Sequence, residues 1–273
     1  MRVTDFGKNS RSEIAYGDSP VIEKTEAIVL RSVKYQESSL ISTLFTEQLG
    51  RVSVIARGAR KPKSRFAAML TLGQIIETVF HHKETRSVQT LTEADYLVPL
   101  GSLRTDVQKL AIVTTLCELL LQLLHENDPN ESLFNYLKTT IVWIERQEDI
   151  SPSLFPYMQI RIADKIGFGL QADADTTGDR FLPGFLSIPT GTVGLYSVTD
   201  LASDPAAVRL TPGQLRFVLY SLLPAGSSAL TVPLSEAECS QLIHYIDRYF
   251  AFHVDGIRPR KSDAIFEQLL YRS

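Results

Sequence analysis

The sequence has only two cysteines, Cys117 and Cys239, and they lie far apart in the chain. Two such residues do not form a disulfide framework, and by themselves they do not complete a structural zinc site. Both fall in segments with a helical pattern. We therefore interpret them as half-buried free thiols in a protein of the reducing cytoplasm.

Long apolar runs are also missing, which excludes the usual membrane-spanning helix. The longest run, Leu116 to Leu124, is interrupted by Glu118 and Gln122. The first 20 residues lack the apolar segment of a secretory signal. We expect no membrane partner.

Motifs of enzyme active sites are absent too. The glycines match neither the phosphate-binding loop nor the dinucleotide pattern, and there is no nucleophile elbow. The one histidine pair, His81 and His82, lies on an expected strand, where neighbouring side chains face opposite sides and do not bind one metal together. We expect no catalytic residues, no metal and no cofactor.

Positive charge is what the sequence does have, concentrated in the stretch RVSVIARGARKPKSR. The whole chain has a formal net charge of -3, yet this stretch contains no acidic residue. It begins with a strand pattern and continues into a loop marked by Gly58 and Pro62. Such a loop presents cations to a polyanion, although on charge alone a solvated loop without a ligand fits equally well. Its cations are Arg51, Arg57, Arg60, Lys61, Lys63 and Arg65.

The first part of the chain, after a polar extension over residues 1–20, predicts a small β domain over 21–99. Short strands with turn signals between them are expected at 22–33, 39–46, 51–56, 74–82 and 88–96. Five strands of this length suit an OB-fold, a five-stranded barrel that binds oligonucleotides. An SH3-like barrel fits the strand count nearly as well.

The second part, residues 100–273, has helical periodicity. A long helix is predicted from a cap at Ser102 to about Glu126, and Ser235 with Glu238 forms a capping box before another. Further helices are expected at 131–146, 152–166, 212–223 and near the C-terminus. Residues 167–208 are rich in Gly, Asp, Pro and Thr, and they predict a long irregular insert. The predicted fold class is α+β, an OB-fold barrel followed by a mainly α-helical domain.

The run from Thr25 to Phe66 resembles the N-terminal signature of the RecO recombination-mediator family. The likeness lies in three turns, Tyr35-Gln36-Glu37, Thr46 to Arg51 and Arg57 to Lys61, and in Thr92-Glu93-Ala94 of the fifth strand. It extends over about residues 22–270 and is most specific in the first 45 of them.

This resemblance implies a non-enzymatic mediator of DNA repair by the RecF pathway, cytoplasmic and associated with the nucleoid. RecO proteins bind single- and double-stranded DNA and anneal complementary strands. They contact the C-terminal tail of single-stranded DNA-binding protein (SSB), and with RecR they help RecA to load on SSB-coated DNA. Many members carry a four-cysteine zinc site in the insert. Residues 167–208 contain no cysteine, so we expect no zinc here.

Single-stranded DNA binding requires cations along the phosphates and aromatic faces for the bases. The predicted DNA-binding residues are Arg31, Lys34, Tyr35, Arg51, Arg57, Arg60, Lys61, Lys63 and Arg65. Phe45 and Phe66 are further aromatic candidates, but Phe45 lies in an apolar strand and suits the core. Neutralising roughly six phosphates predicts a slope of log K against log salt of about -4.

Two other functions remain open from the sequence. The chain fits an enzyme that acts on an acidic metabolite with a site in the helical domain or the insert. It also fits a protein-binding adaptor whose basic loop attracts an acidic partner. If DNA does not bind the loop, the basic segment from Arg258 to Lys261 is the next place to look.

Overall fold

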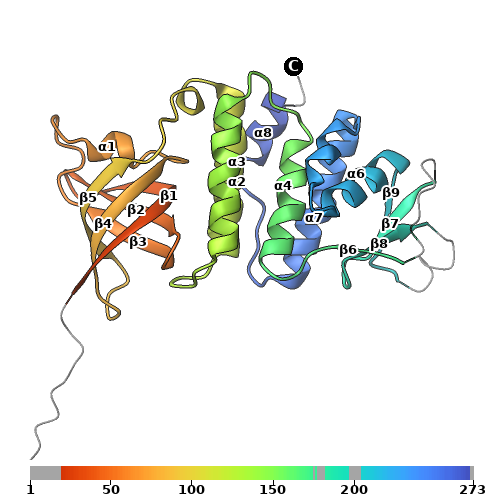
Figure 1. The fold of residues 1–273 in the computed structure, drawn as a ribbon, viewed down its shortest axis with the longest axis horizontal. Helices are drawn as coiled ribbons and strands as arrows, with labels where there is room; N and C mark the ends of the chain where they lie inside the picture. The colour runs from red at the N-terminus through yellow and green to blue at the C-terminus, as the bar shows by residue number, and fades with distance from the viewer. Residues whose placement is uncertain (1–19, 175, 177–181, 197–203, 271–273) are drawn as a thin grey trace, which may run out of the picture.

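The computed structural model describes residues 20–174, 176, 182–196 and 204–270. A β-barrel, a group of helices and a small sheet follow one another along the long axis of the molecule (Figure 1). The predicted N-terminal extension lies, apart from residue 20, outside the described residues.

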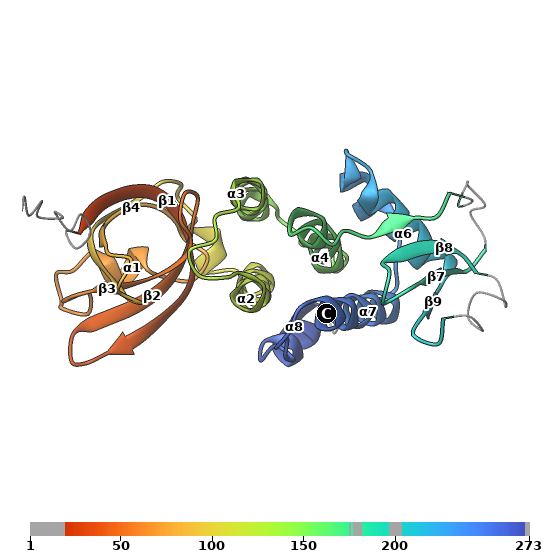
Figure 2. The same ribbon diagram turned by 90° about the horizontal axis from the view of Figure 1, so that it is seen from below.

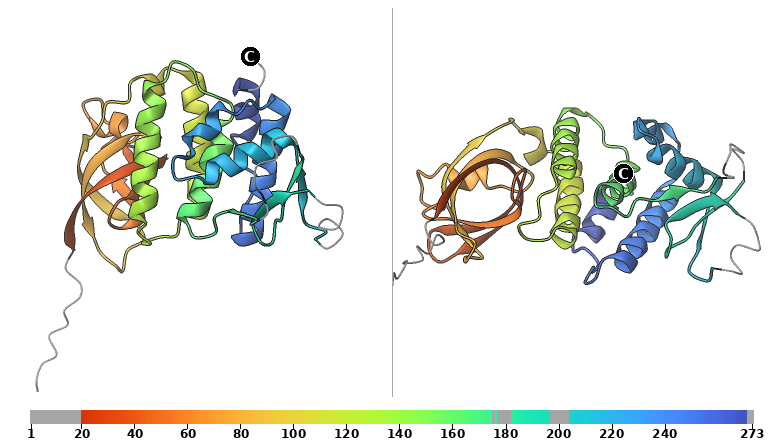
Figure 3. Two further views of the ribbon diagram at one scale, coloured as in Figure 1. Left: turned by 45° about the vertical axis from the view of Figure 1, so that its right-hand side comes forward. Right: turned by 60° about the horizontal axis from the view of Figure 1, so that its bottom comes forward.

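The barrel is made of five strands, β1 (Val21–Tyr35), β2 (Ser39–Thr46), β3 (Gly50–Ala56), β4 (Ile75–His82) and β5 (Gln89–Tyr96). Their order is β1-β2-β3-β5-β4, and the barrel closes because β1 also pairs with β4 (Figure 3). Within the barrel, only β3 and β5 pair in parallel. A short helix, α1 (Phe66–Met69), lies between β3 and β4. This arrangement confirms the predicted OB-fold.

Strand β1 buries both of its faces where it passes the helices. Ala27 and Val29 point into the barrel core, while Ile28 and Leu30 belong to the core shared with the helical domain. A strand buried on both faces has an almost continuous apolar sequence. The register shifts between Val29 and Arg31, so the outward face continues through Arg31 and Val33.

The helical domain contains α2 (Val107–Leu123), α3 (Glu131–Arg146), α4 (Leu154–Lys165), α6 (Pro212–Leu222), α7 (Glu236–His253) and α8 (Asp263–Leu270). Two 3-10 helices, η1 (Ser102–Arg104) and η2 (Gly226–Thr231), accompany them. Helices α2 and α3 stand between the barrel and the other helices (Figure 2).

The prediction that Ser102 caps the long helix was wrong, because Ser102 opens η1 and α2 begins at Val107. Asp106 is the cap, and its carboxylate accepts hydrogen bonds from the backbone N–H groups of Gln108 and Lys109. The Ser102 hydroxyl instead donates to the Glu145 backbone carbonyl. The capping box of Ser235 and Glu238 is present at the start of α7, as predicted.

The predicted insert over residues 167–208 contains more regular structure than its composition indicated. Short segments of it, together with β9, form a four-stranded sheet of β6 (Gln171–Ala172), β7 (Gly184–Leu186), β8 (Thr192–Leu195) and β9 (Val208–Leu210) in the order β6-β8-β7-β9. Leu186, Val193 and Leu210 are fully buried and fix this sheet to the helical core. The strands are two to four residues long, too short for alternation to identify them.

The barrel is fixed against the helices by several contacts. The rings of Phe45 and Phe134 meet edge to face with centroids 5.7 Å apart. The Lys138 ammonium forms an ion pair with Glu26 of β1. At Gly50 the backbone has φ +66°, and an added Cβ would lie 2.2 Å from the Asp128 carbonyl oxygen. Only glycine fits there without displacing the backbone.

Candidate nucleic-acid interface

The outward face of β1, β2 and β3 carries two adjacent cross-strand rows. Register pairs Val33 with Ile41 and Ile41 with Ile55, so three aliphatic side chains form the first row. All three are partly exposed. The neighbouring row is polar and consists of Arg31, Thr43 and Ser53. An aliphatic row flanked by polar groups and cations suits the sugars and base faces of a nucleic acid.

Tyr35 stands at the end of β1 beside this face, with 42% of its surface exposed. Its strand ends in a turn in which Gln36 adopts φ +50°. A surface hollow of about 590 Å³ lies next to it and is lined in part by Tyr35, Ser39, Ile55, Arg57 and Lys61. The hollow therefore combines an aromatic ring of β1 with two cations from the loop that follows β3.

The basic loop, defined here as residues 57–65, is folded into tight turns. The Arg60 N–H donates to the Ser38 carbonyl at 2.9 Å, and the Lys61 N–H donates to the Gly58 carbonyl at 3.0 Å. Ala59 is fully buried in the barrel core and anchors the loop. Gly58 has φ +68°, which favours glycine at that turn. The loop is thus fixed beside the Tyr35 turn.

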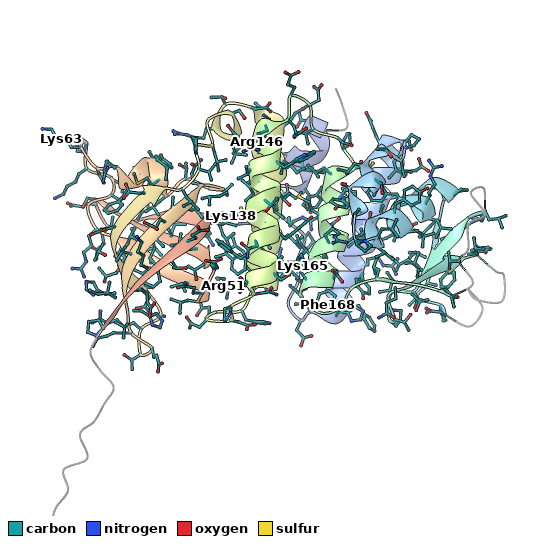
Figure 4. The ribbon with its side chains drawn as sticks, in the orientation of Figure 1. Arg51, Lys63, Lys138, Arg146, Lys165 and Phe168 are labelled. Carbon is teal, nitrogen blue, oxygen red and sulfur yellow. The ribbon has the colours of Figure 1, made fainter. Side chains whose placement is uncertain are left out.

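Most of the loop's cations lie at the surface, and the Arg60 guanidinium also donates to the Gln36 carbonyl at 3.3 Å. The side chains of Arg57, Arg60, Lys61 and Lys63 are exposed, and Lys63 extends beyond the barrel (Figure 4). None of these four forms an ion pair with a residue that the structure describes. Arg65 differs, because its guanidinium lies 3.8 Å from the Asp95 carboxylate.

The remaining predicted residues are placed differently. Lys34 is exposed next to Tyr35, whereas Arg51 lies at the junction of barrel and helices (Figure 4). The Arg51 guanidinium donates to the Leu121 carbonyl at 2.8 Å and lies 3.9 Å from Glu126. Arg51 is therefore not brought together with the loop cations. Phe45 is fully buried, as its apolar strand predicts, and Phe66 packs partly buried on the barrel core.

Two features of the described residues concern metal binding and thiol reactivity. No group of three or more His, Cys, Asp and Glu side chains lies in a position to hold a metal there. Burial raises the pKa of the Cys117 thiol to about 12, so it stays protonated and poorly nucleophilic. No helix among the described residues is both long and apolar enough for a bilayer.

Sequence reasoning missed the aliphatic row of Val33, Ile41 and Ile55. The alternation of β3 contained a signal, since Val52, Val54 and Ala56 point inward and leave Ile55 outside. An isoleucine on the solvent side of a barrel strand marks a surface suited to contact. The pairing of Ile55 with Ile41 and Val33 depends on the register between neighbouring strands, which the sequence pattern does not reveal.

Two family models match the chain. The model "Recombination protein O N terminal" matches residues 21–99, and "Recombination protein O C terminal" matches residues 104–263. A protein of Salinibacter ruber named "DNA repair protein RecO" is 29% identical over 252 residues, which cover 91% of this chain and 94% of the relative. Proteins with the same name from Chloroherpeton thalassium and an Exiguobacterium species are 27% and 30% identical, and each covers 92% of this chain.

Proposed function

The chain belongs to the RecO family, and on that premise we propose that it is a DNA repair protein that binds single- and double-stranded DNA without chemical turnover. This proposal depends on one observation: the basic loop lies beside the Tyr35 turn, at the edge of the outward face of β1, β2 and β3. The four unpaired cations of the loop supply charge for phosphates, and Tyr35 supplies a face for stacking. The net charge of -3 makes this local patch necessary, because the whole chain repels DNA.

The same geometry supports strand annealing. Cations that contact phosphates fix a strand without reading its sequence, so the base edges remain available for pairing. Neutralising phosphates also lowers the repulsion that a second, complementary strand meets. Neither step needs a nucleotide cofactor.

Membership of the RecO family supports a proposal about partner proteins. We propose that the chain contacts the C-terminal tail of SSB and acts with RecR, and that RecA then loads on the SSB-coated strand. DNA binding at the barrel leaves the faces of the helical domain available for protein contacts.

Strand annealing tests the proposal directly. Two complementary oligonucleotides with a donor and an acceptor fluorophore are mixed with the protein in the absence of ATP. We expect energy transfer to appear faster than in protein-free controls, and the acceleration to decline as salt is raised. Unaccelerated annealing by folded protein, together with salt-sensitive binding of acidic peptides, would support the adaptor instead.

Tyr35 gives a second prediction. Replacing it with alanine is expected to weaken single-stranded DNA binding by about 1–3 kcal/mol, since base stacking on an aromatic ring contributes that much per base. Tyr35→Phe keeps the ring and should bind as the unchanged protein does. Tyr96→Ala is the matched control, because Tyr96 is 43% exposed on the same barrel but lies outside the hollow. Equal affinities of Tyr35→Ala and Tyr96→Ala, measured by fluorescence anisotropy, would remove Tyr35 from the interface.

A further inference from the structure

A second groove lies where the barrel meets the helical domain. Leu30 and Arg31 of β1, one side of α2 and the segment of residues 256–261 between α7 and α8 line a hollow of about 670 Å³, called here the interdomain groove. Its floor includes Leu30, Leu72 and Leu121. The exposed cations Arg31, Arg258 and Lys261 also line it.

The exposed cations of the groove outnumber the acidic residues in its lining. None of its exposed cations forms an ion pair with a described residue. Glu118 is the one acidic residue in its lining, and its carboxylate keeps its negative charge while it hydrogen-bonds to Ser262. Its Oε2 accepts hydrogen bonds from the Ser262 N–H at 3.0 Å and the Ser262 hydroxyl at 2.9 Å.

The segment that presents these cations is fixed at several points. The Arg258 N–H donates to the Gln122 side chain of α2 at 2.7 Å. The Arg260 side chain is buried and forms ion pairs with Asp247 and Asp263. The backbone that carries Arg258 and Lys261 is therefore set in place before any ligand arrives, which lowers the entropy lost on binding.

The interdomain groove continues the proposed DNA-binding face. Arg31 belongs both to the polar row of that face and to the groove lining. Cations then run from the basic loop past Tyr35 and Arg31 to Arg258 and Lys261. A phosphodiester chain matches such a track, since it carries one charge per nucleotide and its sugars can lie against the leucine floor. A short acidic peptide would fill the groove alone and would not need this continuity.

We propose that one DNA strand bound on the barrel runs on through the interdomain groove, where Arg258 and Lys261 contact its phosphates. This inference rests on the proposed function and extends its site into the helical domain. The DNA footprint of the chain is then longer than the barrel alone provides, and the two domains hold one strand together.

Oligonucleotide length provides the test. Fluorescence anisotropy is measured with single-stranded probes of about 8 and about 30 nucleotides, since one OB-fold accommodates about 4–16 nucleotides. The variant Arg258→Glu/Lys261→Glu is expected to bind the short probe normally. For the long probe, the slope of log K against log salt should fall by about 1.4 in magnitude, because two phosphate contacts are lost. If the affinities are equal at 1 M salt, this corresponds to about 25-fold weaker binding at 0.1 M salt.

The control variant is Arg104→Glu/Arg146→Glu, which makes the same change in net charge at exposed positions outside the groove. Normal binding of both probes by the control, with selective loss of the long probe by the groove variant, supports the proposal. Equal losses in the two variants, or an unchanged affinity of the groove variant for the long probe, overturn it. Failure of the unchanged protein to bind either probe would instead refute the proposed function.

Photo-crosslinking gives a readout independent of net charge. A long probe with 4-thiothymidine at either end is irradiated on the unchanged protein, and the labelled peptides are identified by mass spectrometry. We expect one end to label the region of Tyr35 and the other to label residues 256–261. Labelling confined to the barrel from both ends would contradict the continuous path.

Discussion

Reversing the four unpaired loop cations is expected to abolish single-stranded DNA binding at about 0.1 M salt. In the variant Arg57→Glu, Arg60→Glu, Lys61→Glu and Lys63→Glu, four phosphate contacts are lost. At about 0.7 counterions per contact, the salt slope falls by about 2.8 in magnitude, equivalent to about 600-fold in affinity at 0.1 M salt relative to 1 M. Repulsion by the introduced carboxylates adds to this loss. The loss should not depend on the oligonucleotide's sequence.

The four replaced side chains are exposed, and the loop's anchor at Ala59 is left unchanged. The variant should therefore fold, with its circular dichroism spectrum and thermal midpoint near those of the unchanged protein. The matched control reverses Arg104, Arg146, Arg209 and Arg248, four exposed arginines of the helical half. Similar affinities of the loop variant and the control would show that net charge governs binding and that the loop is not the site.

The fold of the barrel was predictable because its signals are local. Turn residues separate the strands, and Gly50 occupies a positive-φ position that favours glycine. Alternation within β3 places Val52 and Val54 in the barrel core as the pattern predicts. Strand order was not derivable in this way. The choice of an OB-fold over an SH3-like barrel came from the resemblance, and the pairing of β3 with β5 and of β1 with β4 then bore it out.

Arg51 shows what a local pattern does not reveal. In the sequence it is one of six cations in a run, and nothing separates it from Arg57. In the structure it starts β3 at the end nearest the helices, where the Leu121 carbonyl accepts its guanidinium. The strand spans the barrel and separates Arg51 from the loop. The packing of the two domains determines which end of β3 contacts the helices, and a local sequence pattern does not report that packing.

The interdomain groove was invisible for the same reason. Arg31, Arg258 and Lys261 belong to segments more than two hundred residues apart, and they share a groove only because α2 packs against both the barrel and the segment before α8. The basic character of the C-terminal segment was visible in the sequence. Its alignment with the barrel's outward face was not.

Replacing Arg260 with methionine is expected to lower the free energy of unfolding by about 3–5 kcal/mol, because removing one partner of a buried ion pair leaves an uncompensated charge. The Arg260 side chain is only 4% exposed, and its guanidinium donates to both Asp247 oxygens at 2.6 and 2.7 Å and to Asp263 at 2.8 Å. It also lies over the Phe155 ring, 5.0 Å from the centroid. Arg248→Met, an exposed change on α7, is the control and should cost little.

The loss should depend on pH. Burial raises the pKa of Asp247, and the Arg260 guanidinium opposes that rise. Without Arg260 the folded-state pKa rises further above the unfolded value of about 3.9, so the folded variant takes up a proton that the unfolded chain releases. The variant's stability then falls as pH rises from about 4 through the raised pKa. Urea unfolding should show the largest deficit at neutral pH, and a pH-independent deficit would mean that lost packing outweighs the stranded charge.

The same variant links stability to the proposed DNA path. Arg260 anchors the segment that carries Arg258 and Lys261, so its loss should loosen both cations without removing either. At a temperature where the variant is still folded, we expect weaker binding of the 30-nucleotide probe and unchanged binding of the 8-nucleotide probe. If the long probe binds folded Arg260→Met as tightly as it binds Arg248→Met, the fixed position of this segment contributes nothing to DNA binding.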